Sequence, residues 1–139
     1  MASIAQVSKE FGLSQDTLRY YERVGAVPPV HRTASGIRDY TEEDRGWVSL
    51  AKCMRSAGLP IEVMIEYLRL FQEGDSTFEA RLVLLQDQLE ALEDQKAAIE
   101  STIDRLKYKV AGYEKAVKTG KLEWDEPDPS LFEDSCPTK

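Results

Sequence analysis

The sequence is poor in the residues that build disulfide scaffolds, metal centres and catalytic sites. Its 139 residues include two cysteines, Cys53 and Cys136, which lie far apart and outside any C-x-x-C pair, and a single histidine. A disulfide framework is therefore not expected, in agreement with a reducing compartment. One histidine without a visible nucleophile–base pair gives acid–base or nucleophilic catalysis no support. We expect no enzyme, no cofactor and no metal site.

Long apolar runs are also missing. No stretch approaches about 18 consecutive apolar residues, and the N-terminal MASIAQVSKE has no apolar signal-peptide core. The sequence therefore predicts a cytoplasmic protein with no membrane partner. Hydrophobic residues make up 42% of the chain, enough for a folded core. The length fits one domain, or a small domain plus an extension.

Positive charge is scarce overall, since the net charge is −7, but its distribution is uneven. Residues 1–58 hold eight Lys/Arg and seven Asp/Glu, a balance of +1, whereas residues 59–139 hold ten and eighteen, a balance of −8. DNA binding depends on the potential within a Debye length of about 8 Å rather than on the total. The near-neutral first half therefore remains compatible with a DNA-binding unit. Such a unit should bind non-specific DNA weakly, and it should need a second copy to bind a specific site.

The N-terminal residues carry the pattern of a helix-turn-helix. In SIAQVSKEFG, residues 3–12, Ile4, Val7 and Phe11 recur at helical spacing and Gly12 is a stop signal. Ser14 is the expected N-cap of a second helix from Gln15 to about Val24, followed by Gly25. Two short helices joined by a glycine-containing turn are typical of DNA-binding proteins, but also occur in other small helical proteins.

The next fifty residues predict a hairpin and two connecting helices. Pro28 and Pro29 exclude a continued helix, and HRTASGIRDY, residues 31–40, suits a short hairpin. Thr41-Glu42-Glu43-Asp44 resembles a capping box and opens a helix to about Ala57. Pro60 fits the first position of another helix, which Gly74 ends.

Residues 78–117 repeat apolar side chains with the spacing of a coiled coil. Steps of four and three residues define a seam in which eleven of twelve positions are apolar. At 1.5 Å per residue this helix spans roughly 60 Å, and no second long helix covers it, so we expect a homodimer. The seam residues are Phe78, Leu82, Leu85, Leu89, Leu92, Lys96, Ile99, Ile103, Leu106, Val110, Tyr113 and Val117.

Some features of this helix and of the tail stay open. Lys96 is either a snorkelling side chain or a device that fixes register, and the flanking charges do not decide whether the helices run parallel. After Gly120 the acidic, proline-rich tail predicts a flexible segment in which Trp124, Leu131 and Phe132 could dock against the dimer. The expected organisation is a DNA-binding unit over 1–74, a dimerisation helix over 75–119 and the tail over 120–139.

The stretch TLRYYERVG, residues 17–25, suggests what the first unit binds. Leu18 and Tyr21 share one helix face, while Arg19, Tyr20 and Arg23 lie on the other, where they suit phosphate oxygens. The alternative is an ordinary solvated helix, but the downstream hairpin adds further arginines and an outward tyrosine. The candidate DNA-binding residues are Ser14, Gln15, Thr17, Arg19, Tyr20, Arg23, Arg32, Arg38 and Tyr40.

These motifs resemble the MerR family of bacterial regulators. IAQVSKEFGLSQDTLRYYERVG, the R-x-x-x-G-x-R-x-Y pattern at 32–40 and the heptads occur in the family's order and span about residues 1–118. The resemblance implies a mainly α protein: a winged helix-turn-helix, two connecting helices and an antiparallel dimeric coiled coil. It also implies an activator that bends and undertwists double-stranded promoter DNA so that RNA polymerase can engage both promoter elements.

The resemblance extends to a possible effector site at Cys53. AKCMRSAGLPIE resembles the aldehyde- and thiol-stress branch of the family, in which this cysteine would be the sensor. Lys52 and Arg55 could favour its nucleophilic thiolate; the alternative is a small buried hydrophobe on a face with Trp47. Cys136 could be a resolving thiol. A metal-responsive or effector-free architectural regulator is the second hypothesis, although a tight thiolate site needs two or more soft ligands.

Overall fold

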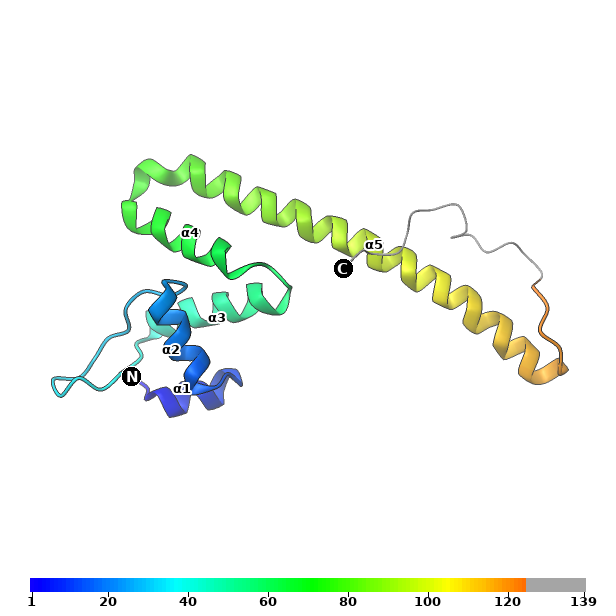
Figure 1. Cartoon of the computed structure of the whole chain (residues 1–139), viewed down its shortest axis with the longest axis horizontal. Coiled ribbons are helices and arrows are strands. Elements are labelled where there is room, and N and C mark those ends of the chain that lie inside the picture. The colour runs from blue at the N-terminus through cyan, green and yellow to red at the C-terminus, as the bar shows by residue number, and fades with distance from the viewer. Residues whose placement is uncertain (125–139) are drawn as a thin grey trace. The chain divides into compact units, whose positions relative to one another are not determined.

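The structure is a computed structural model that describes residues 1–124, and over this range it is helical. The helices are α1 (Ile4–Phe11), α2 (Gln15–Val24), α3 (Glu42–Ser56), α4 (Ile61–Glu73), a short 3-10 helix η1 (Asp75–Thr77) and α5 (Phe78–Thr119) (Figure 1). By its internal contacts the chain divides into unit 1, residues 1–88, and unit 2, residues 89–139. None of the described helices is long and apolar enough to cross a membrane.

Local capping signals place the first helices where the sequence predicts them. Ser3 and Thr41 each form a capping box, and Ser14 accepts a hydrogen bond from the backbone N–H of Thr17 at 3.0 Å. Gly12 ends α1 with φ at 66°, a left-handed conformation that glycine adopts without strain. The prediction for Pro60 is wrong by one position: it is the N-cap of α4, and the helix begins at Ile61.

The core of unit 1 lies between α1, α2, α3 and α4, and the loop joining α2 to α3 projects away from these helices (Figure 1). That loop is the predicted hairpin. It contains an isolated antiparallel bridge between Arg32 and Arg38, and a second bridge joins its end at Tyr40 to Ala2. The loop is thus a wing attached at its base to the chain's N-terminal residues. The largest fully buried side chains are those of Val7, Leu18, Tyr40, Val48 and Met64.

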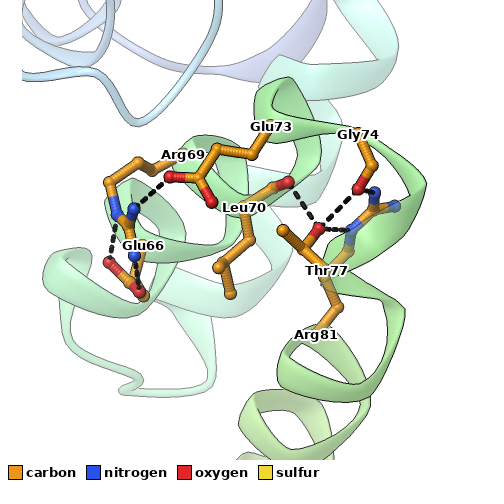
Figure 2. Close-up of polar contacts among 7 residues, drawn as sticks. All are labelled: Glu66, Arg69, Leu70, Glu73, Gly74, Thr77 and Arg81. Carbon is orange, nitrogen blue, oxygen red and sulfur yellow. Dashed lines mark hydrogen bonds and ion pairs between the residues drawn. The ribbon is translucent and has the colours of Figure 1, made fainter.

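The turn between α4 and α5 is held by a buried threonine (Figure 2). The Thr77 hydroxyl lies 2.6 Å from the Leu70 carbonyl oxygen and 2.7 Å from that of Gly74, and it accepts a hydrogen bond from Arg81 Nε at 2.8 Å. Arg81 also donates to the Gly74 carbonyl at 2.6 Å. Its guanidinium lies 4.8 Å from the ring centroid of Phe78. These contacts explain why the first turns of α5 belong to unit 1.

A second set of charges in Figure 2 lies on the exposed face of α4. Arg69 donates to Glu66 at 2.6 Å and pairs with Glu73, one turn away in each direction. The hydrogen bond from Arg69 lowers the pKa of Glu66 below its ordinary value. Because these side chains are about half exposed, water screens the pairs and they add little stability.

Candidate DNA-binding surface

Helix α2 divides its side chains between the core and the exterior as the sequence predicts. Leu18 and Tyr21 are buried, with 1% and 6% of their surface exposed, and so fix the helix against α1 and α3. The opposite face carries Arg19, Tyr20 and Arg23, all of which are exposed. The predicted division of α2 into a buried face and an exposed face is therefore confirmed.

The exposed side chains of α2 are arranged by contacts among themselves. Arg19 donates to Asp16 Oδ1 at 2.9 Å and to Gln15 Oε1 at 3.3 Å. The Arg23 guanidinium lies 5.4 Å from the ring centroid of Tyr20. Around the N-terminus of α2, Ser14 Oγ lies 2.8 Å from Thr17 Oγ1. All six predicted α2 residues, Ser14, Gln15, Thr17, Arg19, Tyr20 and Arg23, therefore lie in or beside one exposed strip.

The wing presents its arginines from a tight turn. The Thr33 N–H donates to the Ile37 carbonyl at 2.8 Å, and the Gly36 N–H donates to the Thr33 carbonyl at 2.9 Å. Gly36 has φ at 86°, which the turn requires and which glycine adopts without strain. Arg32 reaches across the turn and donates to the Gly36 carbonyl at 3.0 Å. Ile37, near the tip, is 64% exposed.

Glu22 links the wing to α2, a role that the sequence analysis missed. Its carboxylate accepts a hydrogen bond from Arg38 Nε at 2.8 Å and from the Val30 N–H at 3.1 Å, and lies 3.8 Å from Arg32 Nη2. The Glu22 side chain is 12% exposed and that of Arg38 is 22% exposed, so the pair is shielded from water. Glu22 therefore holds Arg32 and Arg38 beside the Arg19–Arg23 strip.

Tyr40 does not face outward, so its predicted place in the DNA contact surface is wrong. Its side chain is completely buried, and its backbone exchanges hydrogen bonds with Ala2 at 2.7 and 2.9 Å. Among the described residues, its hydroxyl has no hydrogen-bond partner. Burial raises the pKa of the Tyr40 phenol above its ordinary value, although the nearby Arg38 charge opposes this shift. The side chain anchors the base of the wing from inside the core.

This geometry is matched by known proteins. Residues 2–70 match the family described as MerR HTH family regulatory protein, and residues 45–108 match the family described as MerR, DNA binding. The crystal structure of a MerR family transcriptional regulator from Listeria monocytogenes has a TM-score of 0.82 and 41% sequence identity, over 86% of this chain and 91% of that chain. The chain belongs to the MerR family. It is a DNA-binding transcriptional regulator with a helix-turn-helix.

Two other MerR relatives are similar over different lengths. The HTH-type transcriptional regulator AdhR of Bacillus subtilis is 61% identical over 90 residues, which cover 65% of this chain and 64% of AdhR, less than two thirds of its length. The crystal structure of HiNmlR, a MerR family regulator lacking the sensor domain, bound to promoter DNA, has a TM-score of 0.77 at 32% identity. It covers 86% of this chain and 95% of that chain.

Cys53, the predicted sensor in this MerR chain, is exposed on α3. The buried alternative for this thiol is therefore wrong for the described structure. The two neighbouring cations are bound elsewhere: the Lys52 ammonium donates to the Phe11 carbonyl, and Arg55 donates to the Leu59 carbonyl at 2.7 Å. Cys136 lies outside the described residues. Among residues 1–124, no group of three or more His, Cys, Asp and Glu side chains could hold a metal ion.

Proposed function

We propose that this MerR regulator is a homodimeric activator that bends and undertwists promoter DNA in response to reactive aldehydes, other electrophiles or thiol stress at Cys53. The main support for DNA binding is the exposed strip of α2 from Arg19 to Arg23, beside which Glu22 holds the wing through Arg38 and Arg32. A helix in the major groove and arginines on the flanking phosphates together fix the register of a protein on DNA. The similar HiNmlR, whose structure is bound to promoter DNA, supports promoter DNA as the ligand.

The residues proposed to contact DNA are those predicted residues whose side chains are at least partly exposed. They are Ser14, Gln15, Thr17, Arg19, Tyr20, Arg23, Arg32 and Arg38; Tyr40 is omitted because it is buried. Arg38 has a second task, since it is paired with Glu22 and only partly exposed. We therefore assign the most direct phosphate contacts to Arg19, Arg23 and Arg32.

An exposed apolar stripe along α5 supports the homodimer. Leu82, Leu89 and Leu106 are each more than half exposed, and no residue of α5 is classed as buried. An apolar stripe of this length, interrupted only at Lys96, is unusual on a monomer and marks an interface. The other residues proposed for the dimer seam are Leu85, Leu92, Lys96, Ile99, Ile103 and Val110, with Phe78, Tyr113 and Val117 nearer its ends.

The charges that flank individual seam positions do not fix the helix direction, but the total charges of the two halves of α5 support an antiparallel arrangement. Residues 78–100 hold six Asp/Glu and two Lys/Arg, a balance of −4, whereas residues 101–119 hold two and five, a balance of +3. Antiparallel pairing places each acidic half against the partner's basic half, whereas parallel pairing places like charges together. Complementary potentials favour the antiparallel dimer.

A dimer with two DNA-binding units can deform the promoter, which a monomer cannot. Bending and undertwisting a site of this size costs on the order of several kcal/mol, and contacts at two separated half-sites must offset that cost. RNA polymerase would then meet promoter elements in the orientation it needs. Exposure of the Cys53 thiol supports its role as the sensor, because an electrophile must reach the sulfur. Likeness to the aldehyde- and thiol-stress branch supports this class of inducer.

Footprinting on the regulator's own or a neighbouring promoter tests the proposal. We expect protection of two half-sites and enhanced cleavage at the dyad when an aldehyde inducer is added. Cys53→Ser should abolish the response to the inducer while DNA affinity stays unchanged, and Cys136→Ser is the matched cysteine control. Persistent induction in Cys53→Ser would overturn the sensing proposal, and absence of any sequence preference would overturn the promoter proposal.

A further inference from the structure

Trp124 packs on α5 over the single glycine of that helix. A Cβ added at Gly112 would lie 2.0, 2.6 and 2.7 Å from three carbon atoms of the Trp124 side chain. Contacts this short do not occur, so the indole occupies its position only because residue 112 has no side chain. Glycine inside a helix is less stable than alanine. The close approach of the indole gives a physical reason for a glycine at this position, because alanine would collide with the ring.

Three neighbouring side chains complete the contact surface of the indole. Tyr108 stacks on Trp124 with ring centroids 5.0 Å apart and planes at 20°, and Tyr113 meets it edge-on at 6.1 Å. The Lys109 ammonium lies 4.7 Å from the ring centroid. Offset stacking, edge-to-face contact and a cation over the ring are the arrangements that favour an indole. We call these four residues, Tyr108, Lys109, Gly112 and Tyr113, the Trp124 notch.

The chain reverses sharply after α5 to reach the notch (Figure 1, orange segment). Gly120 has φ at 79°, and its N–H donates to the Ala116 carbonyl at 2.7 Å. The Thr119 hydroxyl lies 3.1 Å from the Lys121 carbonyl and 3.3 Å from the Lys121 nitrogen. The chain beyond Trp124 therefore begins beside the last turns of α5 rather than beyond its end.

Three of the four notch residues lie off the dimer seam, and the fourth, Tyr113, is also a seam residue. The seam residues Leu106, Val110 and Val117 are 59%, 54% and 85% exposed, whereas Tyr108 and Gly112 are half-buried. Residues about one, two and three turns before Tyr108 on the same face, namely Arg105, Ser101 and Ala98, are also half-buried. This face of α5 can therefore be covered while the seam stays open for a second copy.

Charge identifies the occupant that this face would accept. Residues 101–112 hold three Lys/Arg and one Asp, a balance of +2, whereas residues 125–139 hold five Asp/Glu and one Lys, a balance of −4. The fifteen residues after Trp124 can extend about 50 Å, and the face from residue 112 back to 101 is only about 17 Å long. The acidic segment is long enough, and it starts at the right place.

We propose that this outer face of α5, residues 101–112, docks the acidic segment 125–139 of the same chain, with Trp124 as the anchor. Carboxylates of the segment pair with lysines and arginines of the helix, and the indole in the notch supplies the apolar contact. Docking places negative charge beside Arg105, Lys107 and Lys109, and of the notch residues only Tyr113 also belongs to the seam. A helix rich in lysine and arginine otherwise attracts nucleic acid regardless of sequence.

Replacement of the notch glycine tests the anchor. In the full chain with Trp47→Phe, so that Trp124 is the single indole, Gly112→Ala should raise acrylamide quenching by about twofold, since the ring is now 39% exposed and would become fully exposed. Its emission should shift to the red. Gly46→Ala is the matched control, because a Cβ there meets no atom within 4 Å. Equal quenching in Gly112→Ala and the parent overturns the proposal.

A second set of variants tests the occupant. Asp125→Asn, Glu126→Gln and Asp128→Asn together should loosen Trp124, and high salt should do the same to the parent, because both weaken attraction between the segment and the helix. Quenching unchanged by both treatments would mean that the indole binds alone, and the docking proposal fails. Dissociation of the dimer by Gly112→Ala would assign this face to the dimer interface instead, and also overturns it.

Discussion

Glu22 is the residue on which the arrangement of the DNA-facing arginines most depends. Its carboxylate binds one guanidinium directly and lies near a second, and it also accepts a backbone N–H from Val30. A carboxylate that is mostly shielded from water and shared among several donors cannot be replaced without leaving those donors unpaired. The strip on α2 and the wing are separate in sequence, and Glu22 makes them one surface.

Glu22→Gln should lower the free energy of unfolding by about 1–3 kcal/mol, because Arg38 would lose its anionic partner in a shielded position. Glu10→Gln is the matched control: Glu10 is 45% exposed and lies 3.5 Å from Arg45, so its loss should cost little. Urea unfolding of the three proteins measures the difference. Equal midpoints for the two variants would contradict a structural role for Glu22.

Tyr40→Phe should raise the free energy of unfolding by about 1 kcal/mol at neutral pH, because it removes a buried hydroxyl that has no partner among the described residues. The pH dependence has a definite sign. The pKa of the phenol is raised in the folded state. Its contribution to the free energy of unfolding is therefore constant well below pH 10 and falls as the pH rises above it.

The measurement for Tyr40 is thermal unfolding from neutral to alkaline pH. Tyr40→Phe should lose less stability above pH 10 than the parent. In the parent, ionisation of this phenol stabilises the unfolded chain more than the folded one, and the variant has no phenol at this position. Tyr20→Phe, which changes an exposed ring, is the control and should follow the parent. A parallel decline in all three proteins would contradict the argument.

Helices and turns were predictable where their signals are local. Ser14 and Thr41 mark helix starts through hydrogen bonds to residues three positions away, and Gly12 and Gly25 mark ends through their own backbone angles. Glu22 and Tyr40 could not be assigned in this way, because their roles depend on partners sixteen and thirty-eight positions away, Arg38 and Ala2. A pattern on one helix shows which face is polar, but not what the other elements place against it.

The α4–α5 turn is an element whose geometry rests on one hydroxyl. Thr77→Val keeps the shape of the side chain but leaves Arg81 Nε without an acceptor and the Leu70 carbonyl without a donor (Figure 2). We expect a loss of about 1–3 kcal/mol in the free energy of unfolding, measured in urea. Ser76→Ala, at the exposed neighbouring position, is the control and should have almost no effect.

For the whole molecule, the exposed seam of α5 predicts that assembly is required for DNA binding. Ile103→Glu should raise the dimer dissociation constant by about 100-fold or more, because it places a carboxylate among apolar seam residues where it would lose its water. Ala111→Glu introduces the same charge on an exposed position off the seam and is the matched control. Sedimentation equilibrium measures both.

Promoter binding should fail in parallel with assembly. A monomer retains the α2 strip and the wing, so Ile103→Glu should still bind a single half-site weakly and with strong salt dependence. It should not protect a two-half-site promoter at concentrations where Ala111→Glu does, because the second set of contacts is lost along with the partner. If Ile103→Glu is monomeric and still protects both half-sites with parental affinity, the seam has no part in recognition and the proposed mechanism of paired, deforming contacts is wrong.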